Sequence, residues 1–323
     1  MVFAERLGLA DALGSLHRGT PIRLCGVWGP ARGLVLSAIG KASGRPLLVV
    51  TRNLAEAELV AGDLGQYLAP GQAAVFPPFA GRCAGGLATS LDVRSERITA
   101  LSRLLHRDLP VVVIPVQALF DPLIPADALI SATMHLYPQR IVGMERVVAT
   151  LEAGGYQPVP QVEGPGTYSR RGGIVDIWPP QGANPVRLEF FGDAIESLRE
   201  FDGGTQRSLR AIPQVTILPT SEVLLGEGER QTALARLQER GWDPVDAPPP
   251  LATAIRTGCH APGLEAHLPL FYDAVPTLAG YLSPETVVVW DDPGAVEISA
   301  AEIKWAPPSK DPLTVVPPLW EVD

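Results

Sequence analysis

Over the first 118 residues, short apolar runs alternate with longer stretches whose apolar residues recur every three or four positions. The short runs occupy residues 22–27, 46–51, 73–77 and 111–116, and the longer stretches occupy residues 31–42, 53–68 and 92–105. The first pattern is typical of buried strands and the second of amphipathic helices. Because apolar strands joined by helices form parallel sheets with both faces covered, residues 1–118 are predicted to be the first part of a doubly wound α/β domain.

The pattern changes after residue 118. Residues 130–162 contain one helical stretch flanked by strands, and residues 166–180 and 185–202 then alternate between apolar and polar positions. Such alternation is typical of an antiparallel meander, so residues 119–210 are predicted to form a small α+β domain. A last apolar run, VVVW, lies within residues 285–294. We expect this run to complete the first sheet, which makes residues 211–323 the second part of the α/β domain with a C-terminal tail.

The composition narrows the class of protein. Of 323 residues, 46% are hydrophobic, 19% are charged and 33 are prolines, which fits a folded α/β protein with many loops rather than a disordered chain. The net charge of −9 argues against a surface that clamps nucleic acid nonspecifically, because such binding needs clustered Lys and Arg.

The cysteines and the N-terminus bear on the cellular compartment. The three cysteines, Cys25, Cys83 and Cys259, are far apart in the sequence, which favours a reducing compartment over a disulfide framework. Cys259 and His260 lack a second ligand pair at the spacing of a zinc site, so we expect no metal centre. The N-terminal pattern is not that of a signal peptide, and no apolar run reaches the ~18 residues of a membrane span. We expect a cytoplasmic protein without a membrane partner.

The stretch LCGVWGPARG, residues 24–33, stands where nucleotide-hydrolysing proteins place a phosphate-binding loop. Such a loop needs a second glycine, a lysine for the phosphates and a hydroxyl for Mg²⁺. Counted from Gly26, these positions hold Ala31, Arg32 and Gly33. The result is a degenerate loop that keeps Gly26 and Gly29 and offers only the Arg32 charge, so we expect no ATP cofactor.

Two carboxylates follow the last apolar run. Asp291 and Asp292 come directly after VVVW, where a strand of a nucleoside triphosphatase delivers acids to Mg²⁺ and water. Asp-Asp-Pro-Gly is also good turn-forming sequence. Without an intact phosphate loop, we interpret this pair as a degenerate acidic motif, and we expect no catalytic residue in the chain.

Two longer blocks are the most distinctive part of the sequence. Residues 171–179 read RGGIVDIWP and residues 187–196 read RLEFFGDAIE. They resemble the second domain of the nucleotide excision repair protein UvrB and, more closely, that of the transcription-repair coupling factor (Mfd) family. The resemblance extends over most of the chain and implies a UvrB-like fold, namely a degenerate helicase-type parallel-sheet domain with an inserted small α+β domain of the UvrA-binding type.

The resemblance also implies a function. We expect a non-catalytic protein-interaction module that recruits UvrA in transcription-coupled nucleotide excision repair of DNA damage. The full-length family members are ATP-dependent translocases that displace stalled RNA polymerase. RNA polymerase and DNA are therefore expected as partners only through domains that this sequence lacks.

The resemblance places the UvrA-contacting surface on the sheet of the small domain. Arg171 matches a recruiting arginine before the double glycine, and Glu189 matches the acid of the R-x-E segment. Other family arginines fall at Ser169, beside Arg170, and at Pro160. The register of the basic contacts therefore departs from the family pattern.

Elementary strand geometry limits which of these residues reach a partner. Neighbours in a strand face opposite sides, so only one of the two adjacent arginines is expected on the contact surface. Tyr168 and Trp178 would add rigid apolar area beside the charge, as at interface hot spots. In the alternative interpretation Arg171 pairs with Glu189 or Asp176 within the sheet and Trp178 belongs to the core.

Two other functions stay open at this point. One is a nucleoside triphosphatase with a variant loop that uses Arg32 and Asp291. The other is a UvrB-like DNA-binding remnant. UvrB inserts a Tyr-rich hairpin into damaged DNA, and here residues 76–90 occupy that place with too few aromatic rings for base stacking.

Overall fold

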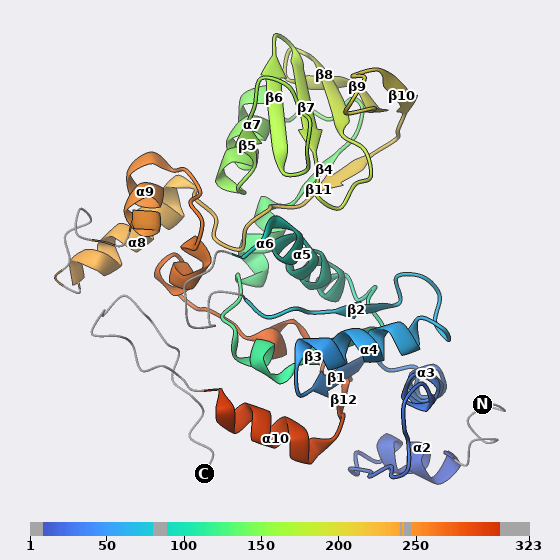
Figure 1. Ribbon diagram of the computed structural model, residues 1–323. Helices are drawn as coiled ribbons and strands as arrows, with labels where there is room; N and C mark the ends of the chain where they lie inside the picture. Colours follow the sequence, from blue (N-terminus) through green and yellow to red (C-terminus); the bar gives the residue numbers. More distant parts are fainter. Residues whose placement is uncertain (1–8, 80–88, 240, 242–246, 248, 304–323) are drawn as a thin grey trace. The chain divides into compact units, whose positions relative to one another are not determined.

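The computed structural model describes the chain except residues 1–8, 80–88, 240, 242–246, 248 and 304–323 (Figure 1). It divides into two compact units. The first takes its described residues from Met1–Pro78, Ala100–Asp121 and Thr277–Trp305, and the second from Phe79–Thr99, Pro122–Pro276 and Ala306–Asp323. The predicted third segment, 211–323, is thus divided between the units, because residues 211–276 lie in the second and residues 277–305 in the first.

The first unit is built on a four-stranded parallel sheet. Its strands are β1 (Leu47–Thr51), β2 (Ala73–Val75), β3 (Val111–Pro115) and β12 (Val287–Trp290), in the order β12-β1-β3-β2. Leu47 of β1 pairs in parallel with Val287 of β12 and with Val111 of β3. Strands β1 and β3 are buried along their whole length, as their continuous apolar runs predict. The prediction that the distant run completes the first sheet is confirmed.

Helices pack on this sheet and close its core. They are α2 (Ala10–His17), α3 (Ala31–Ser43), α4 (Leu54–Leu64), the end of α5 (Leu91–Leu105), the 3-10 turns η2 (Val116–Phe120) and η4 (Leu278–Tyr281), and α10 (Pro293–Glu302). Helix α4 begins where it does because the Asn53 side chain accepts a hydrogen bond from the Glu56 N–H at 2.9 Å. Ile39 of α3 and Val60 of α4 share one buried cluster with Val49 of β1.

One predicted strand of the first unit is wrong. Residues 22–27 have no strand pairing and are mostly exposed. Leu24 keeps 41% of its surface accessible, and Gly26 takes a φ of 76°, which interrupts extended backbone. An apolar run forms a strand only where a sheet edge receives it, and in the described chain no edge pairs with these residues.

The second unit contains an antiparallel sheet with one parallel edge pair. Its strands are β5 (Gln157–Pro158), β6 (Thr167–Arg171), β7 (Ile174–Trp178), β8 (Val186–Phe191), β9 (Ala194–Phe201) and β10 (Ser208–Ala211), in the order β10-β9-β8-β7-β6-β5. A separate pair joins β4 (Met134–Leu136) to β11 (Val215–Ile217). The meander predicted from the alternating residues is confirmed for β6 to β9.

Helix α7 (Met144–Ala153) covers one face of this sheet (Figure 1). Val147 and Leu151 of α7 share a buried core with Val175 of β7 and Leu188 of β8. Because side chains alternate along a strand, the residues between these core positions point to the opposite face. We call that opposite side of β6, β7 and β8 the outer face.

The rest of the second unit is mainly helical. Its helices are α6 (Ala126–Ala132), α8 (Glu227–Glu239), α9 (Pro249–Thr257), the 3-10 turn η3 (Leu264–Leu270) and the beginning of α5. Arg97 of α5 is fully buried, and its Nε lies 2.7 Å from Oε1 of Glu222. The Arg97 guanidinium also lies 3.6 Å from the ring centroid of Phe79. This ion pair joins α5 to the segment that follows β11.

Candidate functional site

The degenerate phosphate loop is a bend before α3. Gly26 and Gly29 take φ values of 76° and 52°, a left-handed conformation that favours glycine. Helix α3 then begins at Ala31, so Arg32 and Gly33 stand in its first turn. The loop therefore keeps the position of a phosphate site at the start of a helix, although the described residues before it, 9–30, form no strand.

Arg32 is bound to the degenerate acidic motif. Its Nη1 lies 2.7 Å from Oδ2 of Asp291, which directly follows β12, and the two side chains are only 23% and 18% exposed. The cation at the lysine position and the carboxylate at the magnesium position thus neutralise each other. Such a pair leaves neither charge available for a phosphate or for Mg²⁺ without first being broken.

Gly33 and Asp292 also have structural roles. A Cβ atom at Gly33 would lie 2.6 Å from the backbone carbon of Asp63 in α4, closer than real Cβ contacts allow. A serine or threonine therefore does not fit at this position without moving α3 from α4. Asp292 caps α10, because its side chain accepts from the Ala295 N–H at 3.3 Å. Asp-Asp-Pro-Gly thus begins a helix here, with Pro293 as its first residue, and does not form the turn expected from the sequence.

A charged network occupies the outer face of the six-stranded sheet in the second unit. Asp176 of β7 is 1% exposed. Its carboxylate accepts two hydrogen bonds from Arg187, from Nε at 2.7 Å and from Nη2 at 2.8 Å. The hydrogen bond to Asp176 raises the pKa of Arg187. Arg171 of β6 adds a single contact of 3.2 Å to the same carboxylate, and its side chain stays 53% exposed. Asp176 is neutralised mainly by Arg187, so the charge of Arg171 is largely presented to solvent.

Exposed apolar side chains lie near this network. Phe191 is 81% exposed and Ile141 is 79% exposed. Both flank Ala194, since Phe191 pairs with it across β8 and β9 and Ile141 bridges to it from the other side. Residues directly opposite in neighbouring strands share a face. These two side chains therefore form a small apolar patch beside the strand β8 that carries Glu189.

Phe191 and Ile141 were missed by the sequence reasoning. Phe190 and Phe191 both read as strand residues, but the β8–β9 register shifts between Glu189 and Phe190. Phe190 packs against the core of the small domain while Phe191 projects into solvent. The available signal was the strict alternation from Leu188, which assigns Phe190 to the core face and Phe191 to the outer face.

The other predicted contact residues lie elsewhere on the sheet. Glu189 is half-buried on the outer face and accepts from the Ser197 hydroxyl at 2.5 Å. Arg170 points to the α7 side, where it pairs with Glu145 at the start of that helix. Tyr168 is 4% exposed in the core, and its hydroxyl donates to Glu152 at 2.5 Å. Burial and this hydrogen bond raise the pKa of Tyr168. The alternation of the strand thus removes Tyr168 from the surface.

Trp178 is the last of the predicted contact residues, and Ser169 and Pro160 are the two positions where the family pattern has arginines. The Trp178 ring lies against Gly203, where a Cβ atom would come within 2.4 Å of it. Its Nε1 donates to the Gly182 carbonyl at 3.3 Å. Ser169 and Pro160, where family arginines are expected, contact each other through a 2.9 Å hydrogen bond from the Ser169 hydroxyl to the Pro160 carbonyl.

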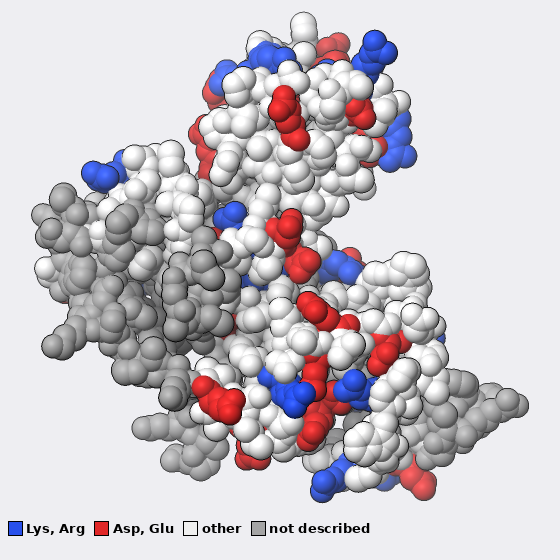
Figure 2. All heavy atoms as spheres, in the orientation of Figure 1, with Lys and Arg blue, Asp and Glu red and all other residues white. Residues whose placement is uncertain are grey.

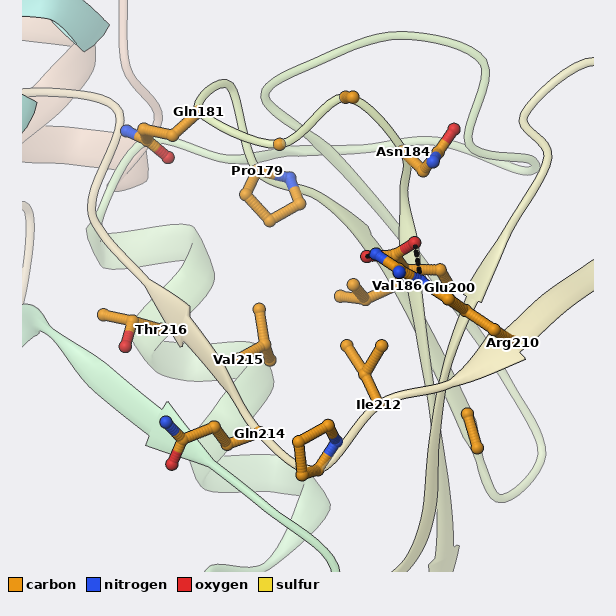
Figure 3. Close-up of a pocket in the computed structure, with 14 residues that line it drawn as sticks. Pro179, Gln181, Asn184, Val186, Glu200, Arg210, Ile212, Gln214, Val215 and Thr216 are labelled. Carbon is orange, nitrogen blue, oxygen red and sulfur yellow. Dashed lines mark hydrogen bonds and ion pairs between the residues drawn. The ribbon is translucent and has the colours of Figure 1, made fainter. Parts of the chain in front are cut away.

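A cavity of about 520 Å³ opens elsewhere in the second unit (Figure 3). The connection from Pro179 to Asn184 and the segment from Arg210 to Thr216 line it. Glu200 and Arg210 in its wall are joined by contacts of 2.9 and 3.0 Å (Figure 3). The bond from Arg210 lowers the pKa of Glu200. The predicted contact residues do not line this cavity, and its charges are paired with each other.

The surface charge shows no extended basic field on the face in view. Lys and Arg side chains alternate there with Asp and Glu over both units (Figure 2). Within the described ranges, His, Cys, Asp and Glu residues form no group of three that could hold a metal ion. None of the described helices combines the length and the apolar character of a membrane span. Most of the region that replaces the UvrB hairpin, residues 80–88, lies outside the described residues, as do Cys83 and the C-terminal tail.

Comparison with known proteins gives a consistent answer. A family model described as the UvrB interaction domain matches residues 134–223. The transcription-repair-coupling factor of Myxococcus xanthus is 32% identical over 311 residues, which cover 92% of this chain and 26% of that protein. The corresponding Bacillus subtilis factor is 29% identical over 226 residues, covering 70% of this chain and 19% of that protein.

The Escherichia coli factor is 29% identical over 211 residues, covering 65% of this chain and 18% of that protein. The chain thus spans only about a fifth to a quarter of the length of these relatives. The matched residues 134–223 include β4 to β11 with α7, and the α/β fold with its insertion is the UvrB-like fold predicted from the sequence. The chain thus has a UvrB-like fold, matches the UvrB interaction domain over part of its length and is similar to the transcription-repair-coupling factors.

Proposed function

We propose that this chain is a protein-binding module that recruits UvrA, and that it serves the coupling of transcription to nucleotide excision repair. The outer face of the six-stranded sheet in the second unit is its contact surface. The observation that carries this proposal is the exposed guanidinium of Arg171 on the same face as an exposed apolar patch, Phe191 with Ile141. Arginine and aromatic side chains, phenylalanine included, are enriched at protein–protein interfaces.

The Asp176 network supports this role for Arg171. Because Arg187 holds the Asp176 carboxylate through two short contacts, Arg171 is not needed to neutralise it. Its guanidinium is therefore free to turn toward a carboxylate of a partner without leaving a buried charge behind. Glu189, fixed by the Ser197 hydroxyl, offers a complementary negative group to a partner's cation.

The same proposal makes the chain non-catalytic. Three features argue against ATP turnover: the Arg32–Asp291 pair, the steric barrier at Gly33 and the use of Asp292 as a helix cap. The relatives are named for coupling transcription to repair. We propose that contacts with RNA polymerase and DNA, and any translocation, belong to other domains of such proteins.

Three binding measurements on the purified chain test the proposal. We expect saturable binding to purified UvrA, no binding of labelled ATP with Mg²⁺ that depends on Arg32, and no salt-dependent binding to a lesion-bearing DNA duplex. Micromolar affinity for ATP that Arg32→Ala abolishes would favour the triphosphatase, and binding to the damaged duplex would favour a UvrB-like DNA-binding remnant. Absence of UvrA binding would exclude the proposed function.

A further inference from the structure

A second cavity lies in the first unit, at the opposite edge of the parallel sheet from the Arg32–Asp291 pair. Its volume is about 380 Å³, within the range of small-molecule sites. Residues at or just before the starts of the strands line it, among them Leu47 of β1, Val111 of β3 and Thr286 before β12. The ends of α3 and α5 complete the wall.

The charged residues of this wall are all cations. Lys41, Arg45 and Arg107 line the cavity, and no Asp or Glu does so among the described residues. The Lys41 ammonium donates to the Tyr67 carbonyl at 2.7 Å. Arg45 donates to the Glu285 carbonyl at 2.6 Å. These contacts are to neutral backbone oxygens, so they orient the cations without cancelling their charge. The wall is thus positively charged although the whole chain carries a net charge of −9.

The helix ends account for only part of this positive charge. Lys41 lies in the last turn of α3 and Arg107 follows the end of α5. Each helix C-terminus carries roughly half a negative charge, so two of them offset about one cation. About two positive charges remain after this offset, and because Lys41 and Arg107 are exposed they stand where the cavity meets solvent, which favours a multiply charged anion.

The backbone at Arg107 strengthens this argument. Its φ is 56°, in the left-handed region that favours glycine. The N–H of Arg107 bonds to the Leu104 carbonyl at 3.1 Å and the N–H of Asp108 to the Arg103 carbonyl at 3.0 Å, the pattern that ends a helix with glycine at this position. Asp108 pairs with Arg103 and not with Arg107. The chain thus places an arginine at a strained position where its side chain reaches a cationic cavity.

Polar groups with spare hydrogen bonds lie in the same wall. The Thr286 hydroxyl is buried without a hydrogen-bond partner in the described structure. Gln72 uses its carbonyl oxygen to accept from the Ala69 N–H at 3.2 Å, which leaves its amide nitrogen to donate. We propose that this cavity binds a small phosphorylated anion, held by Lys41, Arg45 and Arg107 and oriented by Thr286 and Gln72. Guanidinium and ammonium groups are the side chains that proteins use for phosphate oxygens.

Calorimetric titration of the whole chain with inorganic pyrophosphate, and separately with AMP, tests this site. The variants are Arg107→Gly and Lys41→Gln, with Arg52→Gln as a matched control at the other end of β1. We expect saturable binding that each cavity variant weakens at least about tenfold, the loss expected for one charge-assisted contact. Arg52→Gln should leave the affinity unchanged. Tighter binding of AMP than of pyrophosphate would identify a nucleotide, and the reverse order an inorganic anion.

The Arg107→Gly variant separates ligand binding from folding. Because glycine relieves the left-handed backbone, this variant should raise the Tm while it weakens binding. Absence of saturable binding of both anions would overturn the proposal. So would an equal effect of Arg52→Gln, or loss of binding in Arg32→Gln, since the latter would move the anion to the degenerate phosphate loop.

Discussion

Arg32 Nη1 and Asp291 Oδ2 lie 2.7 Å apart across a separation of 259 residues in the sequence. This contact joins the start of α3 to the exit of β12, the two places from which a nucleoside triphosphatase holds phosphate and Mg²⁺. Here the guanidinium of Arg32 and the carboxylate of Asp291 form an ion pair with each other. The remains of the motif therefore contribute to the fold of the first unit, and the proposed function is left to the second unit.

The Arg32–Asp291 pair should contribute modestly to stability. A double-mutant cycle of Arg32→Gln and Asp291→Asn should give a coupling free energy of about 1 kcal/mol, because the two side chains are about one-fifth exposed. Urea unfolding at low and high salt measures it, and the coupling should decrease as salt screens the charges. A coupling of zero at low salt would mean that the contact contributes nothing to the fold.

Restoring the hydroxyl of the phosphate loop should damage the protein. Gly33→Ser should lower the free energy of unfolding by about 1–3 kcal/mol, the usual cost of overpacking, because its Cβ meets the backbone of Asp63. Gly62→Ser is the matched control, since a Cβ at Gly62 in α4 has no atom within 4 Å. A Gly33→Ser protein as stable as wild type, and able to bind Mg²⁺ with ATP, would contradict this account of the loop.

The buried pair of the second unit should matter far more than a surface pair. Glu222→Gln should lower the free energy of unfolding by about 3–5 kcal/mol, because it removes the negative charge of a fully buried ion pair. Arg210→Gln, which removes an exposed partner of Glu200, should lower it by no more than about 1 kcal/mol. Denaturant unfolding followed by circular dichroism measures both. Equal effects of the two substitutions would show that burial does not govern these pairs.

His260 should make the second unit sensitive to acid. Burial lowers the pKa of His260 from 6.5 to about 4, and its Nε2 bonds to the Ala153 carbonyl at 3.1 Å. Nδ1 is buried without a partner in the described structure, so the added proton finds no acceptor. The unfolded chain takes up this proton near pH 6.5 and the folded chain only near pH 4. Stability is therefore full above pH 6.5 and is lost progressively as the pH falls toward 4.

The variant His260→Gln checks this pH dependence. Its side-chain amide can still donate to the Ala153 carbonyl but does not titrate. The free energy of unfolding of wild type should fall between pH 6.5 and 4 more steeply than that of the variant, by up to about 1.4 kcal/mol per pH unit. Parallel slopes for the two proteins would assign the acid sensitivity to other groups.

The sequence was most informative where local pattern and burial agree. Continuous apolar runs predicted β1, β3 and β12, and alternation predicted the meander from β6 to β9. The run at 22–27 misled because strand formation depends on a neighbouring edge, which local sequence does not report. The same limit applies to side-chain pairs: the contact of Arg187 with Asp176 depends on the register of β7 against β8.

The candidate site was predicted only in part for a related reason. Resemblance selected Arg171 and Glu189, both of which lie on the outer face. The hot-spot argument selected Tyr168, which strand alternation places in the core. Phe191 escaped notice although alternation from Leu188 along β8 assigns it to the outer face, because the resemblance offered no contact residue at that position.

The dissociation constant for purified UvrA, measured for two adjacent arginine variants, tests the central claim most directly. Arg171 and Arg170 neighbour each other on β6 but face opposite sides, and each makes an ion pair with one carboxylate. Arg171→Ala, and Phe191→Ala on the same face, should each weaken UvrA binding at least about tenfold with the Tm nearly unchanged. Arg170→Ala should bind like wild type. Loss of affinity in Arg170→Ala with Arg171→Ala unaffected would contradict the assignment of the outer face.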